Sequence, residues 1–219
     1  MKGLLKNNFY GITDSLKVVA LLLIVLGAVL ALLGDASMVG IFPFMPAPLL
    51  AVLSLSCLRR ESASRWCRYK LTLPVRRSDI VKSQYISHAL CSASGAVAAA
   101  IFLAVTVVIH GNIYFYYGFR DALTLIMGGL ILSLLMGAAA YPLCYIWGAE
   151  RMEIILIIAL TAAIAVVFGL SLLLNVMLGD AIVFDILYYI SLLAITVVTA
   201  AVYIGSCFAA AAIYERKEY

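Results

Sequence analysis

The chain has 219 residues, of which 66% are hydrophobic and only 12% are charged, and its mean hydropathy is +1.13. A soluble domain of this length could not bury so many apolar side chains, so the composition excludes that class and predicts an all-α membrane protein. The net charge of +4 is small, and we expect no nucleic-acid partner.

Residues 1–15 precede the first long apolar run, and they carry an amphipathic pattern. Apolar residues recur along one helical stripe at Leu5, Phe9, Ile12 and Leu16. Lys2 and Lys6 fall largely away from this stripe. The pattern predicts an interfacial helix over 1–15, with its lysines toward anionic lipid headgroups. The alternative is that these residues are the frayed start of the first span.

Six apolar runs are each long enough to cross a bilayer, which needs roughly 20 residues. They lie at about 16–34, 39–58, 84–109, 123–147, 154–178 and 184–213. Residues 16–219 are therefore predicted to form a domain of six transmembrane helices, with both termini on one side. Pro43, Pro46 and Pro48 are expected to kink or loosen the start of the second span.

The charged residues indicate orientation and exclude some functions. Arg120 is the only basic residue on the side opposite the termini. The positive-inside rule therefore places both termini and the connection 59–83 in the cytoplasm of a plasma-membrane protein. No Asp, Glu, Lys or Arg lies deep in any run, which disfavours an ion-coupled carrier and an intramembrane protease.

The cysteines and histidines show no metal-ligand spacing. His88 and His110 lie near opposite ends of one apolar run, so they cannot form a paired metal site within that helix. The cysteines are interpreted as reduced packing residues, and no metal site is expected. They are Cys57, Cys67, Cys91, Cys144 and Cys207.

The connection 59–83 is basic and patterned. Trp66, Tyr69 and Leu73 recur at helical spacing with cations beside them, and Pro74 then ends the helix. This predicts a short cytoplasmic helix between the second and third spans. It would lie on the membrane or dock into a groove of a cytoplasmic partner. The alternative is a loop that only anchors to headgroups and fixes topology.

A single long helix is predicted after this connection. Ser78 is a plausible N-cap, with Asp79 in the first turn. From that cap, 78–109 would run for about 32 residues, or about 48 Å. Because the hydrocarbon layer is only ~30 Å thick, we expect the first turns of this helix to project into the cytoplasm.

Small residues and aromatic residues mark two further surfaces. Ser87, Cys91, Gly95 and Ala99 are spaced four apart, which lets a neighbouring helix approach closely. Gly128 and Gly129 offer a second such face. Beyond the third span, the stretch 113–119 reads IYFYYGF, an interfacial aromatic belt by default. The alternative is an extracellular gate formed by Tyr114, Phe115, Tyr116 and Tyr117.

The run ESASRWCRYKLTLPVRRSDIVKSQYI at 61–86 resembles the signature of small ABC-2 type transporter permeases. The matching residues are Glu61, Trp66, Tyr69, Leu73, Pro74, Val75, Arg77, Asp79, Ile80, Val81 and Tyr85. The length, the interfacial helix and the six spans also resemble this family. The particular resemblance is to permeases that export peptides, bacteriocins or phenol-soluble modulins.

The resemblance implies the permease subunit of an ATP-driven ABC exporter that moves peptides or other amphiphiles. It implies two copies of an ATPase subunit, which would bind ATP and Mg²⁺, and a second permease chain forming a homodimer. The implied coupling residues are Glu61, Arg65, Trp66, Arg68, Tyr69, Leu73, Pro74, Arg76, Arg77 and Asp79.

The chain itself has no GxxxxGK[ST] phosphate loop, so it is not expected to be an enzyme or to bind a cofactor of its own. The alternative function is a membrane immunity or sensor protein that docks a cytoplasmic regulator without transport.

Overall fold

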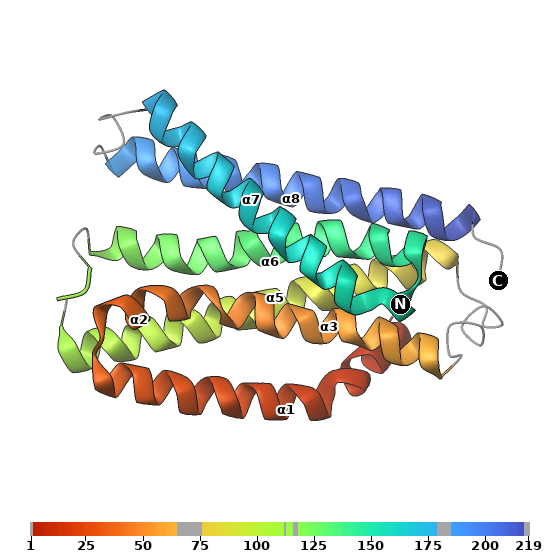
Figure 1. Ribbon diagram of the computed structural model, residues 1–219, viewed down its shortest axis with the longest axis horizontal. Helices are drawn as coiled ribbons and strands as arrows, with labels where there is room; N and C mark the ends of the chain where they lie inside the picture. Colours follow the sequence, from red (N-terminus) through yellow and green to blue (C-terminus); the bar gives the residue numbers. More distant parts are fainter. Residues whose placement is uncertain (1, 65–75, 112, 116–117, 179–184, 217–219) are drawn as a thin grey trace.

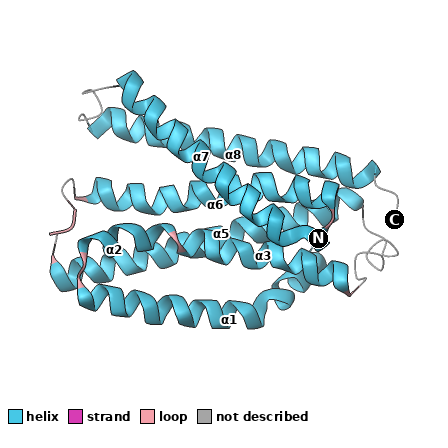
Figure 2. Ribbon diagram, in the orientation of Figure 1, coloured by secondary structure: helices cyan, strands magenta, loops and turns pink. Residues whose placement is uncertain are grey.

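The computed structural model describes residues 2–64, 76–111, 113–115, 118–178 and 185–216. Within these ranges every regular element is a helix (Figures 1 and 2). The α-helices are α1 (Lys2–Leu33), α2 (Ala36–Ile41), α3 (Pro46–Ala63), α5 (Arg77–His110), α6 (Phe119–Trp147), α7 (Met152–Leu178) and α8 (Asp185–Arg216). Two short 3-10 helices are η1 (Phe42–Phe44) and η2 (Ala149–Arg151).

The described residues contain 6 helical stretches that are long and apolar enough to span a membrane. They are Gly3–Leu33, Ala36–Ala63, Arg77–His110, Phe119–Trp147, Ala149–Leu173 and Ile186–Arg216. Each contains a window with a mean hydropathy of at least 2.0. The predicted all-helical architecture with six candidate spans is therefore confirmed.

The starts of α1 and α5 lie at the same end of the bundle as the ends of α3 and α8 (Figure 1). We call this the terminal end. The residues predicted as an interfacial helix do not form a separate element, because α1 is continuous from Lys2 to Leu33. Its first turns bend toward the end of α3 (Figure 1), and Leu4, Asn8 and Ile12 are buried there. The position of these turns relative to the bilayer surface stays a prediction.

The second span is broken near its start, as its prolines predicted. Asp35 caps α2, with its Oδ1 accepting hydrogen bonds from the backbone N–H groups of Ser37 at 2.9 Å and Met38 at 3.1 Å. Pro43 then stands at the start of η1 and Pro46 at the start of α3. Since proline lacks an N–H, it fits the first turn of a helix but interrupts a continuous one.

The third span is one helix of 34 residues, α5, as predicted. It packs against α1, α3, α6 and α8, so it lies in the middle of the bundle together with α6. The predicted N-cap was wrong. The cap position is Arg76, with extended backbone and no side-chain hydrogen bond, and Ser78 lies inside the first turn. Asp79 lies in that turn as predicted.

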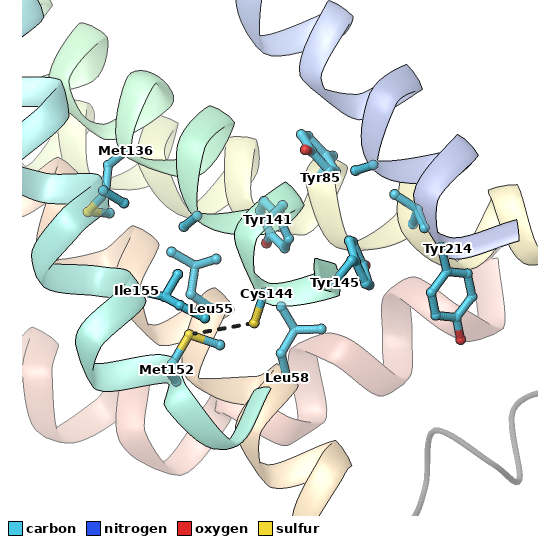
Figure 3. Packing of buried hydrophobic residues seen from close by; sticks show 14 of the residues in the cluster. Leu55, Leu58, Tyr85, Met136, Tyr141, Cys144, Tyr145, Met152, Ile155 and Tyr214 are labelled. Carbon is cyan, nitrogen blue, oxygen red and sulfur yellow. Dashed lines mark hydrogen bonds between the residues drawn. The ribbon is translucent and has the colours of Figure 1, made fainter. Parts of the chain in front are cut away.

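Buried apolar side chains form two clusters. The first joins α3, α5, α6, α7 and α8 toward the terminal end, around Leu55, Tyr85, Tyr141 and Ile155 (Figure 3). The second joins α1 to η1, α3 and α5 around Phe42 and Phe102, whose ring centroids are 4.5 Å apart. The chain therefore has one core around α6 and another beneath α1.

The helices α3 and α5 approach most closely at Gly95. A Cβ atom at this position would lie 2.4 Å from Ala47 Cα and 2.5 Å from Pro46 O. Real Cβ atoms do not approach backbone atoms so closely. The start of α3 could therefore not keep its place against α5 if residue 95 had a side chain.

We predict that Gly95→Ala lowers the stability of the purified protein by about 1–3 kcal/mol, because it overpacks a backbone contact. Gly205→Ala on α8 is the matched control. A Cβ at that glycine meets nothing within 4 Å, so it should stabilise the helix by about 0.5–1 kcal/mol. Thermal unfolding in detergent measures both variants. Equal melting temperatures for the Gly95→Ala and Gly205→Ala variants would contradict the close approach of α3 to α5 at Gly95.

Candidate functional site

The structure describes part of the predicted coupling segment. Glu61 lies in the last turn of α3, Arg76 precedes α5, and Arg77 and Asp79 lie in its first turn. The residues that lie outside the described part of the chain are Arg65, Trp66, Arg68, Tyr69, Leu73 and Pro74. Both ends of the connection 59–83 therefore lie at the terminal end of the bundle.

Glu61 is buried, with only 6% of its surface exposed. Its Oε2 accepts a hydrogen bond of 3.3 Å from Gln84 Nε2 on α5. Burial of a carboxylate is costly unless hydrogen-bond donors replace water. The contact therefore favours one placement of the end of α3 against α5, at the point where the chain enters the connection.

Gln84 joins three helices. Its Oε1 accepts a hydrogen bond from Tyr145 OH, and its backbone oxygen accepts one of 3.1 Å from Tyr141 OH. Tyr141 OH also lies 3.1 Å from Ser54 Oγ on α3. We call Ser54, Glu61, Gln84, Tyr141 and Tyr145 the Gln84 cluster. The rings of Tyr141 and Tyr145 come from α6 and lie beside Tyr85 of α5 (Figure 3).

The next turn of α5 is bound to α8. Tyr203 OH donates to the backbone oxygen of Tyr85 at 2.8 Å and lies 3.0 Å from His88 Nδ1. Tyr85 OH lies 2.8 Å from Ser206 Oγ, which donates to the backbone oxygen of Ala138 on α6 at 2.6 Å. Residues 84–88 of α5 thus hold α3, α6 and α8 through buried hydrogen bonds.

Arginines fix the helix ends on both sides of the connection. Arg60 donates to the backbone oxygen of Gly11 at 3.0 Å and to Ser15 Oγ at 2.9 Å, which ties α3 to α1. Arg59 and Glu153 form an exposed ion pair of 2.7 Å between α3 and the start of α7.

At the other side of the connection, Arg77 Nη1 donates to the backbone oxygen of Glu215 at 3.1 Å, which ties α5 to the end of α8. Each exposed contact contributes little on its own. Together they set the places from which the connection leaves and re-enters the bundle.

A cavity of about 10 Å³ lies between α1 and the Gln84 cluster, which is room for about one water molecule. Asn8, Glu61, Gln84 and Ser87 are among the residues that line it. Asn8 Nδ2 donates to Ser83 Oγ at 3.4 Å, while Asn8 Oδ1 is buried and finds no partner among the described residues. The start of α1 therefore contributes polar atoms to the same region as Glu61.

The predicted small-residue stripe lies on a buried face of α5. Ser87, Cys91 and Ala99 are each at most 3% exposed, and Gly95 lies against the start of α3. Gly128 and Gly129 lie against Phe44 and Pro43 of η1. All these small residues therefore lie where neighbouring segments pack closely.

The predicted gate residues are only partly described. Tyr114 OH donates to the backbone oxygen of Gly34, and the Tyr114 ring packs edge-on against His110. Phe115 is buried in the second apolar cluster. Tyr116 and Tyr117 lie outside the described residues. In the described part of the chain, no three His, Cys, Asp or Glu side chains are grouped closely enough to hold a metal ion.

Comparison with known proteins gives one family. A family model described as "ABC-2 family transporter protein" matches residues 3–215, nearly the whole chain. No match was found among curated proteins or among solved structures. The match is consistent with the six candidate spans.

We predict that Tyr145→Phe lowers the stability by about 1–3 kcal/mol, because it leaves a buried oxygen of Gln84 without its donor. Tyr10→Phe is the control, since Tyr10 is 69% exposed and its change should have an effect within about 0.5 kcal/mol. Thermal unfolding in detergent compares the two. A Tyr145→Phe variant as stable as the control would show that the hydroxyl does not hold α6 to α5.

Proposed function

The chain belongs to the ABC-2 family of transporter membrane proteins, and on this premise we propose that it is the permease subunit of an ATP-driven exporter of peptides or other amphiphiles. Its matched region is the membrane part of such a transporter, and no nucleotide-binding domain is indicated. ABC-2 permeases generally act with ABC ATPases, so the ATP and Mg²⁺ would be bound in a partner subunit. We propose two ATPase copies and a homodimer of this chain.

The main support for this proposal is the set of hydrogen bonds at the two ends of the connection 59–83. The chain leaves α3 beside Glu61 and re-enters the bundle at Arg77, and both sites are fixed to neighbouring helices. A push on the connection by an ATPase would reach α5 along the chain through Arg77 and through the Glu61–Gln84 contact. A loop that only anchors to lipid would not need the buried carboxylate of Glu61 at the point where it leaves α3.

The proposed coupling residues extend across the connection. Trp66, Tyr69 and Leu73 would supply the apolar face that enters a groove of the ATPase, and the cations would line its rim. The full proposed set is Glu61, Arg65, Trp66, Arg68, Tyr69, Leu73, Pro74, Arg76, Arg77 and Asp79. The distribution of basic residues supports a cytoplasmic location for the connection and both termini.

The first experiment is to tag the chain in its host, purify it in mild detergent, identify co-purifying proteins and measure ATP hydrolysis. We expect an ATPase subunit in roughly equal amount. Trp66→Ala combined with Arg68→Ala should weaken its binding by about tenfold or more, because truncation of two anchor residues typically costs about 2 kcal/mol or more.

The matched control combines Tyr10→Ala with Arg151→Ala, an exposed aromatic and an exposed cation outside the connection. This variant should keep the ATPase bound. Purified wild-type protein without any ATPase would contradict the permease function and favour the immunity or sensor alternative. Full ATPase binding by the Trp66 and Arg68 variant would contradict the proposed role of the connection 59–83 in binding the ATPase.

For the far end of the bundle we propose an extracellular gate that includes Tyr116 and Tyr117. Replacing both with Ala should reduce export while membrane insertion and ATPase binding stay normal. Tyr114→Phe is the comparison, because loss of its hydrogen bond to Gly34 should lower stability rather than export per folded molecule. Unchanged export by the Tyr116 and Tyr117 variant would contradict the gate and favour an interfacial aromatic belt at 113–119.

A further inference from the structure

An apolar groove runs along the middle of α1, where this helix packs over η1, α3 and α5. Its volume is about 600 Å³, and its lining includes Leu16, Gly27 and Ala31 of α1, Leu50 of α3, and Ala98 and Phe102 of α5. Figure 1 shows α1 running along one side of the bundle. We call this groove the α1 groove.

Hydrogen bonds join α1 to the bundle near both of its ends. At the terminal end, Gly11 and Ser15 bind Arg60, and Asn8 binds Ser83. At the far end, the backbone oxygen of Ala31 lies 2.7 Å from His110 Nε2, and that of Gly34 accepts from Tyr114. Between these two attachments, α1 packs against η1 and α5, where Gly27 lies against the rings of Phe42 and Phe102. The groove is lined in part by these residues.

The occupant must come from the bilayer. Every lining residue belongs to a candidate span, so the groove opens toward lipid and not toward water. Ile24 and Ile101, which also line it, are 68% and 60% exposed. Because these two side chains lie within candidate spans and are largely exposed, they would face the lipid acyl chains.

The chemistry of the lining favours a hydrocarbon chain over a peptide. Among the described residues that line the groove, Ser94 alone has a polar side chain, and its hydroxyl donates to the backbone oxygen of Cys91 at 2.7 Å. An extended peptide would bring backbone N–H and C=O groups that find no partner there. A helix about 10–12 Å wide would place little more than about one turn in 600 Å³.

The end of the groove next to Leu16 carries positive charge. Arg60 is exposed, and the hydrogen bonds that the structure shows for it go to the neutral oxygens of Gly11 and Ser15. Lys17, the next residue after Leu16, is also exposed and lies 3.8 Å from a carboxylate oxygen of Asp14. The groove extends from Leu16 to Ala31, a rise of about 22 Å along α1.

We propose that the α1 groove binds one acyl chain of an anionic phospholipid, with the headgroup at Arg60 and Lys17. The length of the groove suits a long acyl chain, its lining offers no polar partner, and its basic end attracts a phosphate. The bound chain would lie in the groove along α1, beside the contact of α1 with η1 and α5.

The test uses the full-length protein in phosphatidylcholine vesicles that contain a trace of a photoreactive phospholipid. The probe carries a diazirine at the end of one acyl chain and a phosphatidylglycerol headgroup, and its partner probe differs only in having a phosphatidylcholine headgroup. We expect the anionic probe to label peptides from 16–31 and 94–105 about tenfold more strongly than the neutral probe. Equal labelling by the two probes, or labelling confined to α7 and α8, would overturn the proposal.

Two pairs of variants distinguish the groove from general lipid contact. Ala98→Phe fills the groove, whereas Ala104→Phe places the same ring on an exposed position of α5 outside it. Labelling should be lost in the first and kept in the second. Ala28→Phe at the exposed edge of the groove repeats the test where packing tolerates a larger side chain. Equal labelling in Ala28→Phe and Ala104→Phe would overturn the proposal.

The headgroup site is tested by Arg60→Gln with Lys17→Gln, which should remove the preference for the anionic probe. Retention of that preference would overturn the assignment. Cross-linking of two copies through α1 in the unmodified protein would also overturn it, since a second chain would then occupy the groove. Size-exclusion profiles matching the wild type show that each variant is folded.

Discussion

A hydrogen bond buried inside the protein cannot readily be exchanged for one with water, and this constraint fixes the arrangement around Gln84. Its side chain contacts Glu61 and Tyr145, and its backbone oxygen accepts from Tyr141. Any sliding or rotation of α5 would leave several buried polar atoms without partners, each at a cost of about 1–3 kcal/mol. The register of α3, α5 and α6 is therefore set by a few polar side chains, while apolar packing fills the space around them.

This arrangement divides the chain into a tied group and two less attached helices. Buried hydrogen bonds join α3, α5, α6 and α8 near the terminal end. By contrast, the hydrogen bonds that the structure shows from α1 to other elements lie near its two ends, and apolar packing holds its middle. The helix α7 packs mainly on α6 and crosses the bundle obliquely (Figure 1). A force applied at the connection would therefore move the tied group as one body. Conformational change in the proposed dimer would occur between the two copies more than within one.

Local properties of the sequence were enough to predict much of the fold. Length and hydropathy predicted the spans, the prolines at 43 and 46 predicted the broken second span, and the absence of breakers predicted the long α5. Long-range contacts explain the errors. α5 starts before Ser78, where Arg77 contacts Glu215 of α8.

Glu61 was predicted as a coupling residue in the connection, but its burial depends on Gln84, which no local pattern reveals. The tyrosines at 141, 145 and 203 resemble ordinary span residues until their partners on other helices are known. The predicted docking helix around Trp66 lies outside the described residues and stays a prediction.

The claim that the tied group moves as one body is tested most directly by a pair of spin-label distances in the complex of this chain with the proposed ATPase. Labels introduced through a ketone-bearing amino acid at the exposed residues Ala63 of α3 and Ile204 of α8 avoid the native cysteines. Dilution with unlabelled chain isolates the distance within one copy. The account predicts that this distance is the same without nucleotide and after trapping with ATP and vanadate, while the distance between copies changes. A shift within one copy, with a constant distance between copies, would contradict it.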